Sequence, residues 1–235
     1  MKPFIFKKFQ IFDQNSTMKV GTDGVLLGVY SGKKDFNYAL DIGTGCGLIA
    51  LMLAQKSTGR ILAIDIDEPS VFQAKENFSN SPWNDRLYAN CISLQELAKK
   101  HKNIFDKIVT NPPFFFNSLK PSDSKKVNSK HNSFLSFEDI ADSVEILLSH
   151  DGIFDIILPI ELSINFESVM YNKKLFLNYE LVIFSTIKKP FRKILSFSRN
   201  QTLTFKSERL IIQDETMHFT NEYKNFTSDF YLNLG

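Results

Sequence analysis

Between Ala39 and Pro159, short apolar runs alternate with segments that repeat apolar residues at helical spacing. A strand, a helix and a further strand in succession require a crossover connection, which makes the strands parallel and places helices on both faces of the sheet. The pattern therefore predicts a doubly wound α/β fold. Ser136 and Asp139 have the spacing of a capping box, which marks the start of the last helix. Strands are expected at 39–42, 60–66, 86–91, 105–110 and 153–158, and helices at 48–56, 69–78, 94–101 and 137–148.

The pattern changes after Pro159, where apolar runs follow one another with little helical spacing between them. These runs predict an antiparallel end of the sheet, with strands at 179–186, 193–199, 203–206 and 209–213. We expect a single domain over residues 1–235. Its parts are a covering segment at 1–36, a nucleotide-binding core at 37–159 and an antiparallel part at 160–235.

Composition excludes several classes of protein. Of the 235 residues, 43% are hydrophobic and 23% are charged, which is ordinary for a soluble protein. No run of about 18 apolar residues occurs, so no membrane-spanning segment is expected, and the first residues lack the long apolar stretch of a secretory signal. The two cysteines, Cys46 and Cys91, have no metal-ligand spacing. We therefore expect a cytoplasmic protein without a metal site.

Basic residues are concentrated in two segments. The net charge is only +2, yet residues 118–133 contain four lysines against one aspartate. Residues 185–210 contain seven basic residues against one glutamate, so the rest of the chain is acidic overall. A surface polarised in this way attracts a polyanion. Solvated loops rich in lysine are the alternative interpretation, and composition alone does not separate the two.

A glycine-rich turn follows the first core strand: residues 41–47 read Asp-Ile-Gly-Thr-Gly-Cys-Gly. Glycines let a ligand approach the backbone closely. Asp65, twenty residues after Gly45, ends the next strand and is placed to accept hydrogen bonds from both hydroxyls of a ribose. Dinucleotide sites prefer Gly-x-Gly-x-x-Gly with a helix N-terminus facing a pyrophosphate. Asp41 would repel a pyrophosphate and pair with an ammonium group, so the turn favours S-adenosyl-L-methionine over a nicotinamide dinucleotide.

Residues 110–114 read Thr-Asn-Pro-Pro-Phe and follow an apolar run. Two prolines fix two φ angles and remove two backbone donors, so the strand must stop there on a stiff backbone. The residue before a proline is driven to an extended conformation, which aims the Asn111 side chain outward. An amide, a proline carbonyl and the Phe114 ring then suit a planar group that bears an NH₂, because two oxygens accept its hydrogens and the ring stacks on it.

These motifs resemble the class I S-adenosylmethionine-dependent methyltransferases that methylate amino groups. Asn-Pro-Pro-Phe is shared by adenine N6, guanine N2 and glutamine N5 methylases. Further blocks, at residues 9–11, 13–15, 18–28 and 226–232, resemble the bacterial valine-tRNA (adenine-37-N6) methyltransferases over nearly the full length. The resemblance implies a Rossmann-like, mainly parallel seven-stranded sheet with an antiparallel last strand and a short N-terminal extension. It also implies methyl transfer to the exocyclic amine of the adenine beside the valine anticodon. We expect the protein to bind tRNA as a monomer.

The motifs and the resemblance together assign the site residues. Catalysis is assigned to Asn111, Pro112, Pro113 and Phe114. Cofactor binding is assigned to Lys19, Thr22, Asp23, Asp41, Gly43, Thr44, Gly45, Gly47, Asp65, Ile66, Asn90 and Asn111. Substrate binding is assigned to Phe114, Phe115, Lys130, His131, Lys188, Lys189, Arg192 and Lys193. Asn90 stands where the family often has an acid, and an N-cap role is the structural alternative for Asp23.

Rival functions remain open at this point. Glutamine N5 methylation of a release factor and guanine N2 methylation of ribosomal RNA would use the same two oxygen acceptors. The basic segments and the block at 18–28 argue against both. A nicotinamide oxidoreductase is disfavoured by the glycine spacing and by Asp41, and an RNA-binding protein without activity would keep the same fold.

Overall fold

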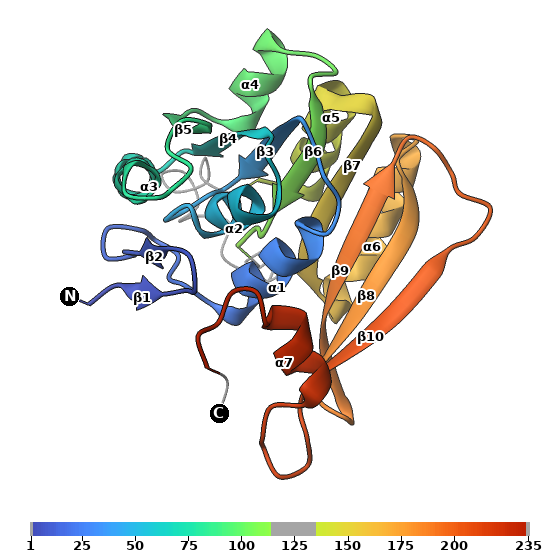
Figure 1. The fold of residues 1–235 in the computed structure, drawn as a ribbon. Coiled ribbons are helices and arrows are strands. Elements are labelled where there is room, and N and C mark those ends of the chain that lie inside the picture. Colours follow the sequence, from blue (N-terminus) through green and yellow to red (C-terminus); the bar gives the residue numbers. More distant parts are fainter. Residues whose placement is uncertain (1, 114–134, 234–235) are drawn as a thin grey trace, which may run out of the picture.

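An eight-stranded sheet forms the centre of the computed structural model, which describes residues 2–113 and 135–233 (Figure 1). In spatial order the strands are β10 (Lys206–Gln213), β8 (Phe176–Thr186), β9 (Lys189–Ser198), β7 (Leu148–Pro159), β6 (Phe105–Thr110), β3 (Tyr38–Ile42), β4 (Arg60–Asp65) and β5 (Leu87–Cys91). Strand β9 is antiparallel to both of its neighbours, and every other adjacent pair is parallel. The sheet is therefore mainly parallel with one reversed strand.

Helices cover both faces of this sheet, and each face has its own hydrophobic core. One core takes side chains from α1 (Thr22–Ser31), α2 (Leu48–Lys56), α3 (Glu68–Ser79) and α7 (Asn221–Thr227). The other takes side chains from α4 (Leu94–Lys100), α5 (Phe137–Leu147) and α6 (Ile160–Asn172). Alternate residues of β3 divide between the two cores, with Ala39 in one and Leu40 in the other, as the two-residue period of a strand requires. The doubly wound α/β prediction is confirmed.

Three features differ from the sequence-based expectations. The sheet has eight strands and not seven, because residues 206–213 form one continuous strand, β10, beyond β8. The reversed strand is β9, whereas β10, the last strand along the chain, runs parallel to β8. Helix α6 was not predicted, although Ser163, Phe166 and Met170 are buried at helical spacing. The capping box at Ser136 and Asp139 is present and begins α5 as predicted.

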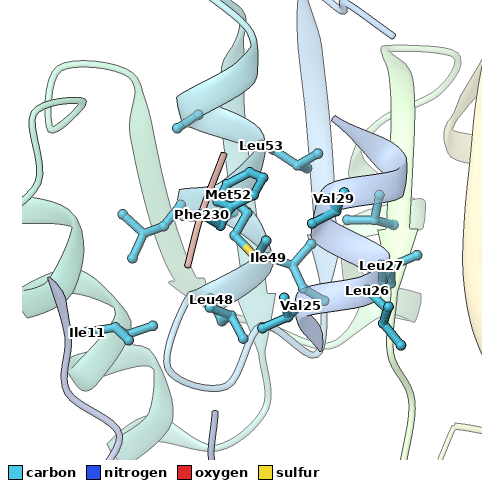
Figure 2. Close-up of a cluster of buried hydrophobic side chains, with 14 of the residues drawn as sticks. Ile11, Val25, Leu26, Leu27, Val29, Leu48, Ile49, Met52, Leu53 and Phe230 are labelled. Carbon is cyan, nitrogen blue, oxygen red and sulfur yellow. The ribbon is translucent and has the colours of Figure 1, made fainter. Parts of the chain in front are cut away.

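The N-terminal extension forms a small ribbon of two strands, β1 (Phe4–Ile5) and β2 (Gln10–Ile11). The ribbon lies beside the end of the chain, because the backbone N–H of Lys7 donates to the carbonyl of Phe230 at 2.8 Å. Figure 2 shows Ile11 and Phe230 in the same cluster as the α1 and α2 side chains. The two ends of the chain thus share the core that supports the start of α2.

Helices α1 and α2 approach each other closely at Gly28. A Cβ atom placed there would lie 2.6 Å from the sulfur of Met52 and 2.9 Å from its Cβ. Overpacking a well-filled core costs about 1–3 kcal/mol, whereas alanine gains at most about 1 kcal/mol of helix propensity over glycine. We expect Gly28→Ala to lower the free energy of unfolding by about 1–2 kcal/mol in a denaturant titration. Equal or greater stability would mean that the α1–α2 contact adapts to the added methyl group.

Candidate functional site

The candidate site lies at the carboxyl ends of the parallel strands. Strand β3 ends at Ile42 and leads into the glycine turn, residues 43–47, and then into α2. Ile42 pairs with Thr110, the last residue of β6. The next residue, Asn111, therefore lies beside the glycine turn. The hydroxyl of Thr110 donates to the Ile42 carbonyl at 3.0 Å and joins the two strand ends. Ligands of open α/β sheets bind at this edge.

A cleft of about 360 Å³ opens at this edge. Its walls come from residues 18, 19 and 21–24, residues 43–46 of the glycine turn, the first residues of α2, Asn111 and Phe191. Gly47, which was also expected to bind the cofactor, does not line it. The volume falls within the range of small-molecule sites. Gly43 has a φ of 67°, and no atom lies within 4 Å of the point where its Cβ would be. A side chain at this position would be strained and would fill the cleft, so the glycine keeps space for a ligand.

Asp41 lies beneath the glycine turn and is fully buried. Its Oδ2 accepts hydrogen bonds from the Thr44 hydroxyl at 2.7 Å and from the Ala50 N–H at 3.2 Å. Its Oδ1 has no donor among the described residues. Burial raises the pKa of Asp41 to about 7. The carboxyl group therefore holds the turn through Thr44, which lines the cleft, whereas Asp41 itself does not line it.

Asp65 holds the same turn from strand β4. Its Oδ2 accepts the Gly45 N–H at 2.9 Å, and its Oδ1 accepts the Asp67 N–H at 3.0 Å. A carboxylate offers about four lone-pair positions, so both oxygens can also accept from the hydroxyls of a ribose. Ile66 and Asn90 are exposed at the same edge of the sheet. None of Asp65, Ile66 and Asn90 lines the cleft itself.

Asn111 combines burial with an unused acceptor. The side chain is only 9% exposed and lines the cleft, and its Oδ1 has no donor among the described residues. An unpaired buried polar atom costs about 1–3 kcal/mol, so such atoms are rare in folded proteins. Pro112 is buried and Pro113 is exposed. The cleft thus contains an amide oxygen ready to accept a hydrogen bond.

Sequence reasoning missed the contacts that hold residues 12–18 over the glycine turn. The backbone of Phe12 exchanges two hydrogen bonds with the Asn77 side chain, which also donates to the Cys46 carbonyl at 2.8 Å. The Thr17 N–H donates to the Ser70 hydroxyl at 3.2 Å. Ser70, Gln73 and Asn77 are buried on one face of α3. That polar stripe, at helical spacing, was the signal in the sequence.

The expected residues of the N-terminal segment reach the cleft: Lys19, Thr22 and Asp23 all line it. The Lys19 ammonium donates to the backbone carbonyls of Asp13 and Gln14. The N-cap of α1 is Gly21, so the alternative role of Asp23 as N-cap is wrong. Instead, Asp23 forms an ion pair with Arg192, with 2.8 Å between its Oδ2 and the arginine Nε.

The predicted basic surface of β9 is divided between two faces. Lys188 and Lys189 are exposed at the turn between β8 and β9. Arg192 points toward α1 and Asp23, whereas Lys193, on the opposite face of the strand, pairs with Glu180 at 2.8 Å. The turn therefore offers two lysines to solvent at the edge that carries the cleft. Phe114, Phe115, Lys130 and His131 lie outside the described residues.

Comparisons with known proteins define the family. The family model described as "Methyltransferase small domain" matches residues 16–125. A protein of Bacteroides fragilis named tRNA1(Val) (adenine(37)-N6)-methyltransferase is 36% identical over 233 residues, with 98% of each chain covered. A protein of the same name from Flavobacterium johnsoniae is 36% identical and covers 98% of this chain and 100% of its own. The chain belongs to the tRNA1(Val) (adenine(37)-N6)-methyltransferase family.

Solved structures of methyltransferases share the fold of this family member. A predicted O-methyltransferase from Agrobacterium tumefaciens superposes with a TM-score of 0.66 at 13% identity, over 88% of this chain and 96% of its own. The P. horikoshii TYW2 protein in complex with MeSAdo gives a TM-score of 0.61 at 14% identity, over 84% and 71% of the two chains. At such identities the likeness concerns the fold alone.

In residues 2–113 and 135–233, no group of three or more His, Cys, Asp or Glu side chains is placed to hold a metal ion. In the same ranges, no helix has the length and apolar character needed to cross a membrane.

Proposed function

We propose that the protein transfers a methyl group from S-adenosyl-L-methionine to N6 of adenine 37 in the anticodon loop of valine tRNA. The observation that carries this proposal is the unpaired Oδ1 of Asn111 in the cleft beside the glycine turn. The names of full-length relatives at 35–37% identity give the target nucleotide. We also propose that the whole chain acts as one domain, because both hydrophobic cores pack on the same sheet, and that it is a cytoplasmic monomer.

The residues of the cleft fit S-adenosyl-L-methionine. The open side of Gly43 gives room next to the backbone. Asp41 is fully buried and would act on the bound cofactor through the turn that it holds at Thr44. Asp65 would accept from the ribose hydroxyls, and Asn90, further along the same edge, would contact the adenine. When bound, the cofactor supplies an electrophilic methyl group on a sulfonium.

Asn111 and Pro112 would bind the amine that is methylated. The nitrogen lone pair of an adenine amine is delocalised into the ring, which makes it a poor nucleophile. An N–H donated to Asn111 Oδ1, and the other to the Pro112 carbonyl, would draw this nitrogen toward tetrahedral geometry and aim its lone pair. No strong base is needed, because the amine loses its proton readily once alkylated. Positioning of this kind can supply up to about 7–11 kcal/mol of the barrier reduction.

Lys188 and Lys189, exposed at the β8–β9 turn, are proposed to bind tRNA phosphates. If each neutralises one phosphate, Lys188→Ala/Lys189→Ala should reduce the log–log slope of tRNA affinity against salt by about 1.4. The control is Lys99→Ala/Lys100→Ala, which removes two exposed lysines at the end of α4. Fluorescence titrations at several salt concentrations measure the slope. An equal loss in both double variants would rule out a specific role for the turn.

Labelled S-adenosyl-L-methionine tests the proposed function directly. The protein is incubated separately with unmodified valine tRNA, ribosomal RNA and release factors, and the labelled product is digested and analysed. We expect N6-methyladenine in the tRNA, and loss of the label when adenine 37 is replaced by guanine. N2-methylguanine in ribosomal RNA, or label on a glutamine side chain, would overturn the assignment in favour of another amino-methylase.

A further inference from the structure

Phe191 brings an aromatic ring to the cleft from a strand that the sequence motifs do not include. It is half-buried near the start of β9 and lines the cleft together with Asn111 and the glycine turn. Among the described residues of the cleft wall, it is the one aromatic side chain. The ring therefore offers a flat apolar surface beside the amide oxygen of Asn111.

Register places Phe191 at the edge where the reaction is proposed. Arg192 pairs with Pro159, the last residue of β7, so Phe191 lies just beyond the end of that strand. Strand β7 is the neighbour of β6, which ends at Thr110 beside Asn111. Along the chain, Phe191 directly follows residues 187–190, which are exposed at the turn between β8 and β9. The ring thus connects the proposed RNA-binding turn with the proposed methylation site.

Arg192 holds this ring in place. The guanidinium carbon lies 5.0 Å from the centre of the Phe191 ring, and an Nη atom donates to the Phe191 carbonyl at 3.1 Å. The Nε of the same side chain is fixed by Asp23 of α1 at 2.8 Å. The ring is therefore held in one position before a ligand binds, so less side-chain entropy is lost when a ligand packs on it.

The same contact decides which of the two ligands proposed for this site, the methyl donor or the target base, packs on the Phe191 ring. A cation such as a sulfonium is attracted to an aromatic face, but the guanidinium of Arg192 already lies over the Phe191 ring and makes that contact. A neutral base needs no cation contact and stacks on an aromatic ring whatever its sequence. The geometry thus favours a nucleobase over the methyl donor.

We propose that Phe191 stacks on the target adenine and sets its plane relative to Asn111. This inference rests on the proposed function and adds a substrate-positioning residue to it. A loop base must leave its stack to reach such a cleft, and a ring that replaces the lost stacking lowers the cost of that step. Phe191 would act on the base together with Asn111 and Pro112.

Two substitutions of Phe191 test this role, because they distinguish the effect of an aromatic ring from that of apolar side-chain volume. Phe191→Leu keeps an apolar side chain and removes the flat face, and Phe191→Tyr keeps the ring. We expect Phe191→Leu to lower kcat/KM for valine tRNA by about 5- to 150-fold, the range for one stacking contact. The Kd for S-adenosyl-L-methionine, measured by calorimetry, should stay within about twofold, and Phe191→Tyr should restore most of the lost turnover. Phe191→Met replaces the leucine variant if that variant fails to fold.

Three outcomes would overturn the inference, and each has a different meaning. An unchanged kcat/KM in Phe191→Leu would mean that the ring does not touch the base. A cofactor Kd that rises in parallel with the loss of turnover would place the ring against the methyl donor. A wild-type protein that methylates no adenine in tRNA would overturn the proposed function itself, and this inference with it.

Discussion

Asn111→Ala is expected to lower turnover on valine tRNA by about 10²- to 10³-fold, the usual loss for one preorganised polar contact. The Kd for S-adenosyl-L-methionine should change little, because the proposed partner of Asn111 Oδ1 is the amine of the base. Single-turnover kinetics with labelled cofactor measure the first quantity and calorimetry the second. Normal turnover by the variant would remove Asn111 from the reaction.

Stability gives a second measurement on the same variant. Asn111 Oδ1 is buried and has no donor among the described residues, so within them the substitution removes no hydrogen bond to this oxygen. A protein often becomes more stable when a residue that serves function at a cost to folding stability is replaced. Asn111→Ala should therefore unfold at the same denaturant concentration as the wild type, or at a higher one. A marked loss of stability would indicate a structural role instead.

Asp155→Ala is expected to lower the free energy of unfolding by about 3–5 kcal/mol, because it leaves a buried charge without its partner. The Lys107 ammonium lies 2.8 Å from Asp155 Oδ2, and the two side chains are 4% and 1% exposed. The other oxygen of Asp155 accepts from the Ser196 hydroxyl at 2.5 Å, and Ser196 is hydrogen-bonded to Tyr30 of α1. Removing the carboxylate would disrupt this whole network beneath α1.

Two further variants test whether the loss of stability in Asp155→Ala comes from leaving a buried charge without a partner. Lys107→Met/Asp155→Leu removes both charges, and a buried pair replaced by apolar residues is often neutral in stability. We expect this double variant to be more stable than Asp155→Ala. Asp142→Ala breaks the partly exposed pair with Lys173 and should cost at most about 1 kcal/mol. Denaturant unfolding of all three measures the differences, and equal losses in Asp155→Ala and Asp142→Ala would contradict the argument.

Local patterns determined which parts of the fold could be predicted. Helix α2 (Leu48–Lys56) and strand β6 (Phe105–Thr110) have the bounds that the sequence predicted, because glycine and proline mark their ends. Helix α6 was missed because its buried face carries Ser163 as well as Phe166 and Met170, which weakens the apolar period. The pairing of β10 with β8 joins two strands that are not consecutive along the chain, and no local pattern reports such a contact.

The candidate site also has features that the sequence predicted and features that it did not. The glycine turn and Asn111 meet in one cleft because parallel strands bring their ends together, which the order of elements already implies. The partners of the charged residues could not be read from the sequence. Arg192 was expected to face RNA and is paired with Asp23, and Lys193 is paired with Glu180 across the adjacent strand. Such pairs depend on register and on which face of a strand each residue occupies.

A crystal structure with bound S-adenosyl-L-methionine tests the central claim most directly. The account predicts that the methyl donor occupies the cleft of about 360 Å³, with its sulfonium next to Asn111 and its ribose at Asp65. A second cavity, of about 380 Å³, lies beside Lys107, Asp155 and Tyr30. A donor bound there, or anywhere remote from Asn111, would contradict the account.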